Sequence, residues 1–333
     1  MAHGRLLGTG SAVPDRVVTN AELCGYMDTS EEWILDRTGI RERRWVSPGS
    51  GQGSVELGAL AAERALADAG VAPDQISLII FATLSPDHDF PGNGVLLQRR
   101  LGIPQPMTLD VRQQCNGFIA GLSVADAFIR SGQHRHVLVV ASEVQSTGLD
   151  LSTRGRDMTV IFADGAGAAV IGPSDDDAHR ILSTHLHVDG NHAEDLWCEF
   201  PSSKQSPRLT ADAVAEGRHY PRMQGRTVFR HAIQRMPEAV HEALRANGLQ
   251  LSDLDLLVPH QANLRIVQGV QQALGLTDEK IVVNIDRYGN TTSASIPLAL
   301  DEARKQGRAR PGHLVCLTAF GSGFTWGSAL LRL

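Results

Sequence analysis

The sequence predicts an α/β protein made of two similar halves related by a pseudo-twofold axis. Apolar runs of strand length alternate with longer helical patterns, and such uninterrupted strands indicate sheets that are covered by helices on both faces. Two helix–glycine–strand segments, 65–81 and 243–259, align without a gap at an offset of 178 positions. Each half also ends in a glycine-rich strand pair, at 160–171 and at 317–330.

The elements between these segments follow in the same order in both halves. The first half has a helix that starts at Cys115, ends near Gly132 and leads to a strand at 137–140. The second half has a helix that starts at Asn290, ends near Gly307 and leads to a strand at 314–317. We therefore expect an N-terminal half over 1–175 and a C-terminal half over 176–333, joined by the polar segment 173–177.

Composition excludes several classes of protein. The chain has 333 residues, 42% of them hydrophobic, and a formal charge of −6, which argues against a nucleic-acid partner. The N-terminus lacks the apolar core of a signal peptide, and no stretch approaches the ~20 apolar residues of a membrane span. The four cysteines are far apart and form no Cys-x-x-Cys pair. This usage predicts a reducing cytoplasm, no disulfide and no metal site.

Cys115 is the first candidate for chemistry. It follows the strand-like residues 109–111 and precedes a small-residue helix over 116–129. Unpaired N–H groups and the dipole at a helix N-terminus favour the thiolate, which is the nucleophilic form. The alternative is a buried structural cysteine, since free cysteines are often core residues.

The duplication indicates where partners of Cys115 should lie. His260 follows the second-half strand at the position that Ala82 has in the first half, and Asn290 starts the helix equivalent to the Cys115 helix. Duplicated halves commonly share one site, so we expect His260 and Asn290 to converge on Cys115. A surface or core histidine and a helix N-cap are the alternatives for these two residues.

Seven motifs, in order, resemble β-ketoacyl-acyl carrier protein synthase III, a condensing enzyme of the thiolase superfamily. They lie at 29–34, 37–43, 109–118, 164–167, 258–266, 288–297 and 319–327, so the resemblance covers nearly the whole chain. It implies the five-layered αβαβα thiolase fold and a homodimer. A dinucleotide-binding reading of 164–169 fails, because the third glycine is missing and a strand follows.

The resemblance assigns roles to the catalytic residues. Cys115 accepts an acyl group from acyl-coenzyme A. His260 and Asn290 stabilise the enolate that forms when malonyl-carrier protein, or malonyl-coenzyme A, loses CO2. The backbone N–H groups of Cys115 and Ser322 bind the oxyanion of the condensation step. No metal or cofactor is implied beyond the coenzyme A and phosphopantetheine thioesters that serve as substrates.

Substrate delivery implies a tunnel with a cationic mouth. By resemblance, Trp33, Arg37, Arg156 and Asn263 bind coenzyme A, and Arg265 docks the acidic acyl carrier protein. The alternatives are amphipathic helix packing for Trp33, a helix-start role for Asn263 and a solvated charge for Arg265.

Three departures from the family's housekeeping pattern concern the acyl group. Gln113 and Gln114 stand before Cys115 where small residues are usual, and Arg226 replaces an asparagine near the pantetheine. The loop 85–94 also differs; by resemblance it reaches across the dimer to shape the partner's acyl pocket, with Phe90 at the gate, and Gln114 belongs to the acyl pocket as well. These differences suggest a secondary-metabolism paralogue.

Two other functions remain compatible with the sequence. The first is acyl transfer from Cys115 to a hydroxyl or amine without condensation, with His260 as general base. The second is a catalytically silent subunit that binds carrier protein or dimerises. Acylation of Cys115 by acyl-coenzyme A separates an enzyme from a silent subunit.

Overall fold

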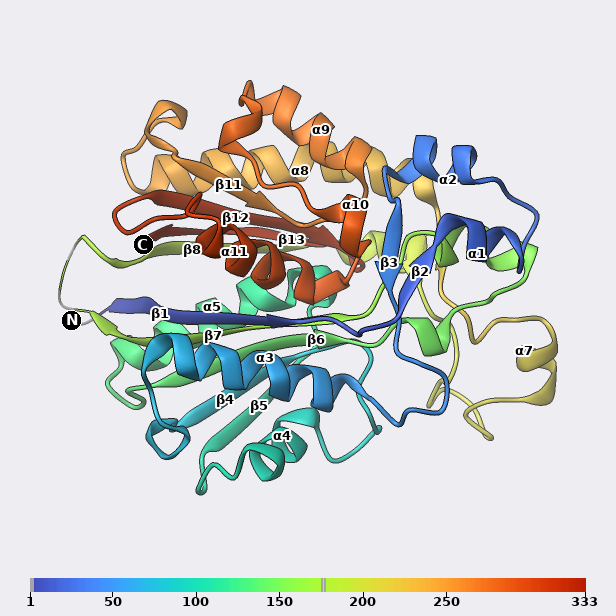
Figure 1. Ribbon diagram of the computed structural model, residues 1–333, viewed down its shortest axis with the longest axis horizontal. Coiled ribbons are helices and arrows are strands. Elements are labelled where there is room, and N and C mark those ends of the chain that lie inside the picture. The colour runs from blue at the N-terminus through green and yellow to red at the C-terminus, as the bar shows by residue number, and fades with distance from the viewer. Residues whose placement is uncertain (1–2, 175, 177) are drawn as a thin grey trace.

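The computed structural model describes residues 3–174, 176 and 178–333, and it contains two β-sheets with helices outside and between them (Figure 1). The first sheet has the order β1-β7-β6-β4-β5, and the second has the order β11-β12-β13-β8. The strands of the first sheet are β1 His3–Ala12, β4 Leu78–Ala82, β5 Met107–Val111, β6 Val137–Glu143 and β7 Gly165–Ser174. Those of the second are β8 Arg180–Val188, β11 Leu256–Pro259, β12 Leu314–Gly321 and β13 Thr325–Arg332.

Helices form the other layers. Their bounds are α1 Asn20–Cys24, α2 Glu31–Thr38, α3 Ser54–Ala69, α4 Asn93–Leu101, α5 Gly117–Arg130, α6 Arg156–Thr159, α7 Ala211–Ala215, α8 Gly225–Ala246, α9 Leu264–Leu274, α10 Ile285–Tyr288 and α11 Ser295–Lys305. Two short ribbons pair β2 Val17–Thr19 with β3 Glu42–Arg44, and β9 Leu196–Trp197 with β10 Arg222–Met223.

The two sheets repeat one topology, which confirms the predicted pseudo-twofold arrangement. The strands β4, β6, β7 and β1 correspond in order to β11, β12, β13 and β8. The central pairs β4–β6 and β11–β12 are parallel, and the pairs that follow them are antiparallel. Even β5 has a counterpart, because a parallel bridge joins Leu257 of β11 to Ile281.

Three apolar clusters separate five layers in the order αβαβα, as predicted. The central cluster lies between the sheets, around α5 and α11, and the outer clusters lie under α3 with α4 and under α8 with α9. Strand β4 is buried on both faces: Ile80 joins the central cluster, whereas Ile79 and Phe81 join an outer one. Small residues let α5 approach the sheet; a Cβ on Gly121 would lie 2.7 Å from Val139 Cγ1.

The helix starts differ from the prediction. Cys115 lies in the 3₁₀ turn η2 (Gln114–Asn116), and α5 begins only at Gly117. In the second half the turn η8 (Thr292–Ala294) precedes α11. Both turns open on a residue with positive φ, 45° at Gln114 and 49° at Thr292. Cys115 and Ser293 are each the second residue of their turn, so the structural counterpart of Cys115 is Ser293 and not Asn290. The sequence did not reveal this, because a non-glycine residue with left-handed backbone carries no clear sequence signal.

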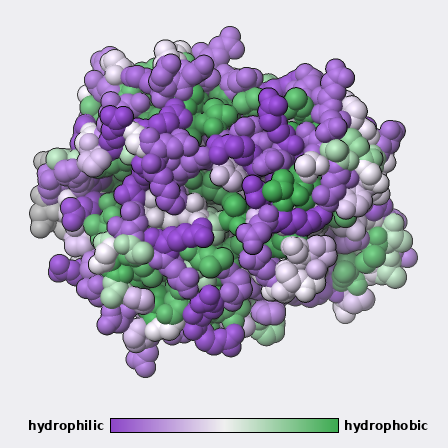
Figure 2. Space-filling view, viewed as in Figure 1, coloured by the Kyte–Doolittle hydropathy of each residue, from purple (hydrophilic) through white to green (hydrophobic). Residues whose placement is uncertain are grey.

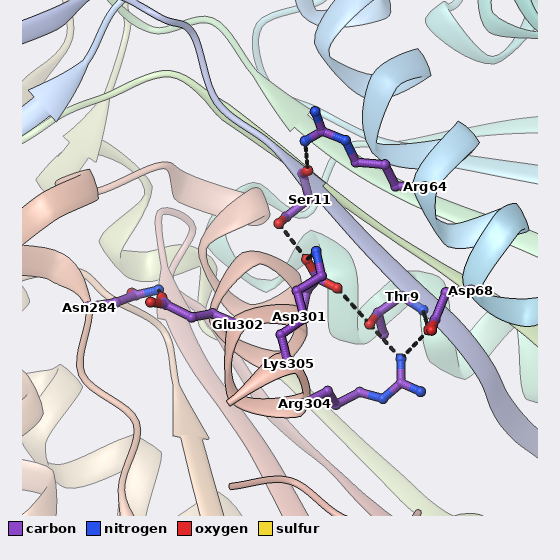
Figure 3. A network of polar contacts seen from close by, with 9 residues as sticks. All are labelled: Thr9, Ser11, Arg64, Asp68, Asn284, Asp301, Glu302, Arg304 and Lys305. Atoms are coloured by element: carbon purple, nitrogen blue, oxygen red, sulfur yellow. Dashed lines mark hydrogen bonds and ion pairs between the residues drawn. The ribbon is translucent and has the colours of Figure 1, made fainter. Parts of the chain in front are cut away.

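A polar network fastens α11 of the second half to β1 of the first (Figure 3). Asp301 is 1% exposed and accepts hydrogen bonds from Thr9 Oγ1 at 2.9 Å and Ser11 Oγ at 2.5 Å. Lys305 Nζ lies 2.7 Å from the same carboxylate. Arg304 bridges Thr9 and Asp68 with 2.6 Å contacts to each. The network thus fixes the position of α11, which begins at Ser295.

Hydrophilic side chains cover most of the face in Figure 2, and apolar residues form scattered patches on it. Among the described residues, no helix has both the length and the apolar character needed to cross a membrane. The predicted boundary between the halves touches residue 175, which lies outside the described residues. The strands on either side of it end at Ser174 and begin at Arg180.

Candidate active site

One cavity of about 680 Å³ brings together most of the predicted site residues. Its buried end contains Cys115, His260 and Asn290, which are 6%, 1% and 5% exposed. Its mouth is lined by charged and aromatic side chains, and its walls are mainly apolar. The other lining residues include Trp33, Arg37, Arg156, Asp157, Phe162, Leu196, Met223, Arg226, Phe229, Met236, Asn263, Arg265, Phe320 and Gly321.

Cys115, in the turn η2, packs tightly against the end of β12. Gly321 of β12 lies against it, and a Cβ there would be 2.9 Å from Cys115 Cβ and 3.2 Å from Cys115 Sγ. Burial, with a smaller contribution from the charge of Glu143, raises the pKa of Cys115 to about 12. The resting group is thus a thiol. Burial opposes the thiolate that a helix N-terminus would favour, and α5 starts two residues after Cys115.

His260 follows β11, and its ring is oriented by α11. Ser295 Oγ lies 2.6 Å from His260 Nδ1 and accepts the backbone N–H of Gln261 at 3.4 Å. We assign the Ser295 hydroxyl as the donor to Nδ1, which places the ring proton on Nε2, the nitrogen that does not contact Ser295. Burial lowers the pKa of His260 to about 3, so the ring is neutral. Such a ring is a neutral N–H donor.

Asn290 is fixed by both its backbone and its side chain. Its N–H donates to Ile161 at 2.9 Å, and its carbonyl accepts from Ala163 at 2.9 Å. The side-chain Oδ1 accepts the N–H of Thr292 at 2.8 Å, which defines the amide orientation, and Nδ2 donates to Ala262 at 3.3 Å. The other N–H of this amide is available to a ligand. The cavity thus contains two neutral donors beside a thiol.

The cavity mouth is cationic and includes the indole ring of Trp33. Arg156 covers the Trp33 ring at 4.5 Å, and Arg37 lies 5.8 Å from the same ring centroid. Arg226 also lines the mouth. Arg265 pairs with Asp36 at 2.8 Å. The expected cluster of an indole ring and guanidinium groups is present, although Arg156 already stacks on the indole.

Two family models, described as 3-oxoacyl-[acyl-carrier-protein] synthase III and as its C-terminal part, match residues 109–190 and 244–333. A β-ketoacyl-[acyl-carrier-protein] synthase III of Sodalis glossinidius is 48% identical over 328 residues, which is 98% of this chain and 99% of the relative. The chain belongs to the 3-oxoacyl-[acyl-carrier-protein] synthase III family. It is therefore a condensing enzyme of the thiolase superfamily.

Solved structures agree with this assignment. The synthase III of Aquifex aeolicus has a TM-score of 0.89 and 39% identity, covering 99% of this chain and 100% of its own. The priming β-ketosynthase of a polyketide pathway has a TM-score of 0.89 and 37% identity, covering 99% and 96%. The thiolase fold of this synthase III family member is thus established over its full length.

Asn263 has a structural task in this family member. Its Oδ1 caps α9 by accepting the N–H of Arg265 at 2.8 Å, and its Nδ2 donates to the carbonyl of Arg37 at 2.9 Å. It therefore joins α9 to α2 at the cavity mouth. The helix-start alternative describes its side chain, while its position on the cavity wall leaves the predicted coenzyme A contact as a prediction.

Three predicted residues lie outside the cavity lining. Phe90 is 84% exposed, in the loop that follows β4. Gln114 is half-buried in η2. The Ser322 hydroxyl donates to the carbonyl of Leu196, which secures the turn after Gly321. Their assigned roles, in the acyl pocket for the first two and the oxyanion site for Ser322, stay predictions.

Sequence reasoning missed three residues of the synthase III site. Gly321 contacts the nucleophile, Ser295 orients His260, and Glu143 lies buried behind η8. The glycine-rich ending and the motif at 288–297 contained the first two, but only their distances reveal the contacts. In the described part of the chain, no group of three His, Cys, Asp or Glu side chains could hold a metal ion.

Proposed function

We propose that this chain loads an acyl group from acyl-coenzyme A onto Cys115 and condenses it with a malonyl thioester, with loss of CO2. The observation that carries the proposal is the single cavity in which Cys115 meets the side chains of His260 and Asn290. The product is a β-ketoacyl thioester in fatty-acid or polyketide initiation. Malonyl-acyl carrier protein is the extender, with malonyl-coenzyme A as the alternative donor.

The first half-reaction is acyl transfer. Cys115 sulfur attacks the thioester carbonyl, the carbon–sulfur bond to coenzyme A breaks, and the thiol proton leaves with the coenzyme A sulfur. Burial raises the pKa of Cys115, so the reaction starts from the thiol and the proton is lost as the sulfur attacks. Backbone N–H groups of Cys115 and Ser322 stabilise the tetrahedral oxyanion.

The second half-reaction is decarboxylation followed by condensation. The carbon–carbon bond to the malonyl carboxylate breaks, CO2 leaves, and the electron pair becomes an enolate. His260 Nε2–H and the Asn290 amide donate to the enolate oxygen. The enolate carbon attacks the acyl carbonyl, the carbon–sulfur bond to Cys115 breaks, and the Cys115 thiolate takes up one proton from solvent. The lowered pKa of His260 suits this role, because a neutral ring donates without trapping the enolate by protonation.

Delivery of the substrates depends on the mouth. Trp33, Arg37 and Arg156 hold the nucleotide end of coenzyme A through stacking and phosphate contacts, with Asn263 on the adjoining wall. Arg265 meets the acidic surface of acyl carrier protein. The ion pair of Arg265 with Asp36 is exposed, so a carrier-protein carboxylate can replace it at little cost.

Intact-protein mass spectrometry with a panel of acyl-coenzyme A esters tests the first half-reaction, and CO2 release from malonyl-carrier protein tests the second. Wild-type protein should gain an acyl mass, and Cys115→Ala should gain none. Asn290→Ala should keep acylation but lose most CO2 release. Equal loss of both half-reactions in Asn290→Ala would contradict its assigned role.

Acyl transfer to a hydroxyl or amine is the alternative outcome of the same assay. Product formed without CO2 release would support it, with Cys115 still acylated. The departures at Gln113 and Gln114 and the similarity to a polyketide priming enzyme make starters other than acetyl part of the panel.

We propose further that the protein works as a cytoplasmic homodimer. Strand β5 is an edge of the first sheet, and apolar side chains near it are exposed: Met107 at 42%, Val95 at 46% and Phe90 at 84%. Pairing of two β5 strands would cover them and bring Phe90 to the partner's acyl pocket. Light scattering of the wild-type protein and of Met107→Lys tests this, with a monomeric wild type as the contrary result.

A further inference from the structure

Glu143 is a buried carboxyl group that the proposed mechanism does not use. It ends β6, is 0% exposed, and forms no ion pair with a described cation. Its two oxygens instead accept five hydrogen bonds. The donors are Ser293 Oγ at 2.6 Å, Ser85 Oγ at 2.7 Å, and Thr83 Oγ1, Leu84 N and Gln145 Nε2 at 3.1 Å each.

The hydrogen bonds are arranged for an acceptor. Ser85 Oγ accepts the N–H of Val144 at 2.9 Å, and Thr83 Oγ1 accepts the N–H of Ser85 at 3.1 Å, so both hydroxyl protons remain for Glu143. Leu84 and Gln145 contribute N–H groups, which only donate. Burial raises the pKa of Glu143, and these bonds oppose that effect. The Thr83 and Ser85 hydroxyls also lie 3.4 Å from each other, but their contacts with Glu143 are shorter, and five donors around one carboxyl group match a carboxylate.

The donors come from three segments, and two of these have different tasks. Thr83 and Ser85 begin the loop that carries Phe90, whereas Ser293 lies in η8, directly after the Asn290 segment. Ser293 also faces the other catalytic turn, because a Cβ on Gly117 would lie 3.2 Å from Ser293 Cβ. Glu143 thus joins the start of the Phe90 loop to η8, and Ser293 of η8 in turn packs against the start of α5.

We propose that Glu143 is a positioning residue: it fixes η8, and with it Asn290, relative to Cys115, and it anchors the first residues of the Phe90 loop to the same point. The inference rests on the proposed function for the reaction in which Asn290 acts. Glu143 touches neither substrate nor reacting atoms. It acts through Ser293 and through its charge.

The charge of Glu143 should affect the ionisation of Cys115, which can be measured and which a purely structural residue would not change. A negative charge behind η2 opposes ionisation of Cys115, in addition to burial. The other titratable groups near these segments are the neutral His260, the exposed His88 and the hydrogen-bonded carboxyls of Asp87 and Asp164. Those groups stay in place when Glu143 is changed.

The first experiment follows alkylation of the Cys115 peptide by iodoacetamide against pH, using mass spectrometry to separate it from the other three cysteines. Glu143→Gln removes the charge but keeps an acceptor, and we expect the pH midpoint to fall by about one unit. Glu143→Asp, which keeps the charge, should retain the wild-type midpoint. Glu63→Gln, on the exposed face of α3, is the matched control and should also leave it unchanged.

The second experiment measures both half-reactions. Ser293→Ala cuts the link to η8 but keeps the Glu143 charge, so it should retain the alkylation midpoint and acylation while CO2 release falls about tenfold. An unshifted midpoint in Glu143→Gln, together with equal loss of both half-reactions in Ser293→Ala, overturns the proposal. Alkylation needs no substrate. If wild-type protein releases no CO2, the proposed function fails while the midpoint shift still reports on Glu143.

Discussion

At the scale of single residues, the contact between Gly321 and Cys115 leaves no room for another atom. Gly321→Ala would place a Cβ 2.9 Å from Cys115 Cβ and 3.1 Å from its backbone nitrogen. The Cys115 backbone or side chain would have to move to make room for this methyl group, and misplacing a nucleophile costs about a hundredfold in rate. We expect acylation to fall by that factor in stopped assays with acyl-coenzyme A, while Gly148→Ala, which meets nothing within 4 Å, should acylate normally.

A second residue-scale prediction concerns Ser295. Removing its hydroxyl in Ser295→Ala frees His260 Nδ1, so the ring proton is no longer held on Nε2. The loss of one oriented hydrogen bond is worth about 1 kcal/mol, and we expect CO2 release to fall about fivefold with little change in acylation. Ser131→Ala removes an exposed hydroxyl that bonds Phe128 and serves as control. A parallel loss of acylation would argue against this role.

Residue-level expectations from sequence succeeded where a motif had a fixed neighbourhood and failed where contacts join distant segments. The convergence of Cys115, His260 and Asn290 could be predicted, since a duplicated topology implies it. The link of Asn263 to Arg37 joins residues more than two hundred positions apart, and the five donors of Glu143 come from three segments. Such contacts depend on the folded chain.

At the scale of elements, α11 is held to β1 through the buried Asp301. Asp301→Ala would leave Lys305 and the hydroxyls of Thr9 and Ser11 without their shared acceptor. Breaking such a buried network costs about 3 kcal/mol in the free energy of unfolding. Urea unfolding measures this loss, and Asp74→Ala, an exposed site, should lie within about 0.5 kcal/mol of wild type. If Asp301→Ala also changed the free energy of unfolding by less than about 0.5 kcal/mol, the network would not stabilise the fold as described.

The helix starts show the limit of sequence reasoning for elements. Apolar and small-residue patterns predicted the helices that became α5 and α11, but the chain inserts a 3₁₀ turn before each. The insertion depends on left-handed backbone at Gln114 and Thr292, neither of which is a glycine. Packing of η2 against η8 offsets the conformational cost of these two left-handed residues. A local sequence pattern could not reveal the turns, because their stability comes from this tertiary contact.

At the scale of the whole molecule, stability should depend on pH through His260. The pKa of His260 is lowered from 6.5 to about 3 by burial. Below pH 6.5 the unfolded chain binds a proton that the folded chain does not, so His260 costs about 1.4 kcal/mol of stability per pH unit as the pH falls toward 3. Above pH 6.5 the two states match and the effect vanishes.

Urea unfolding at about pH 7 and about pH 5 measures this dependence. His260→Gln should lose less stability between the two conditions than wild type, by about 2 kcal/mol. His241→Gln, at an exposed position of α8, should follow the wild-type curve. Parallel curves for all three proteins would show that the buried ring does not titrate as described.

The whole fold was the most predictable level. Order and offset of the repeated segments predicted two equivalent halves, and the seven motifs predicted the layers. The counterpart of β5 was not predictable, because the second half reduces it to a single bridge at Ile281. The repeated order of segments therefore predicts the topology of the two sheets, but not whether each strand of one half is fully formed in the other.

The arginines of the cavity mouth have a kinetic consequence. The chain is acidic overall, yet Arg37, Arg156, Arg226 and Arg265 gather at one opening, so an acidic protein approaching from afar is repelled elsewhere and drawn there. Attraction of this kind acts on encounter and is screened beyond about 8 Å at physiological ionic strength. Added salt should therefore slow turnover with carrier-bound malonate more than turnover with small thioesters.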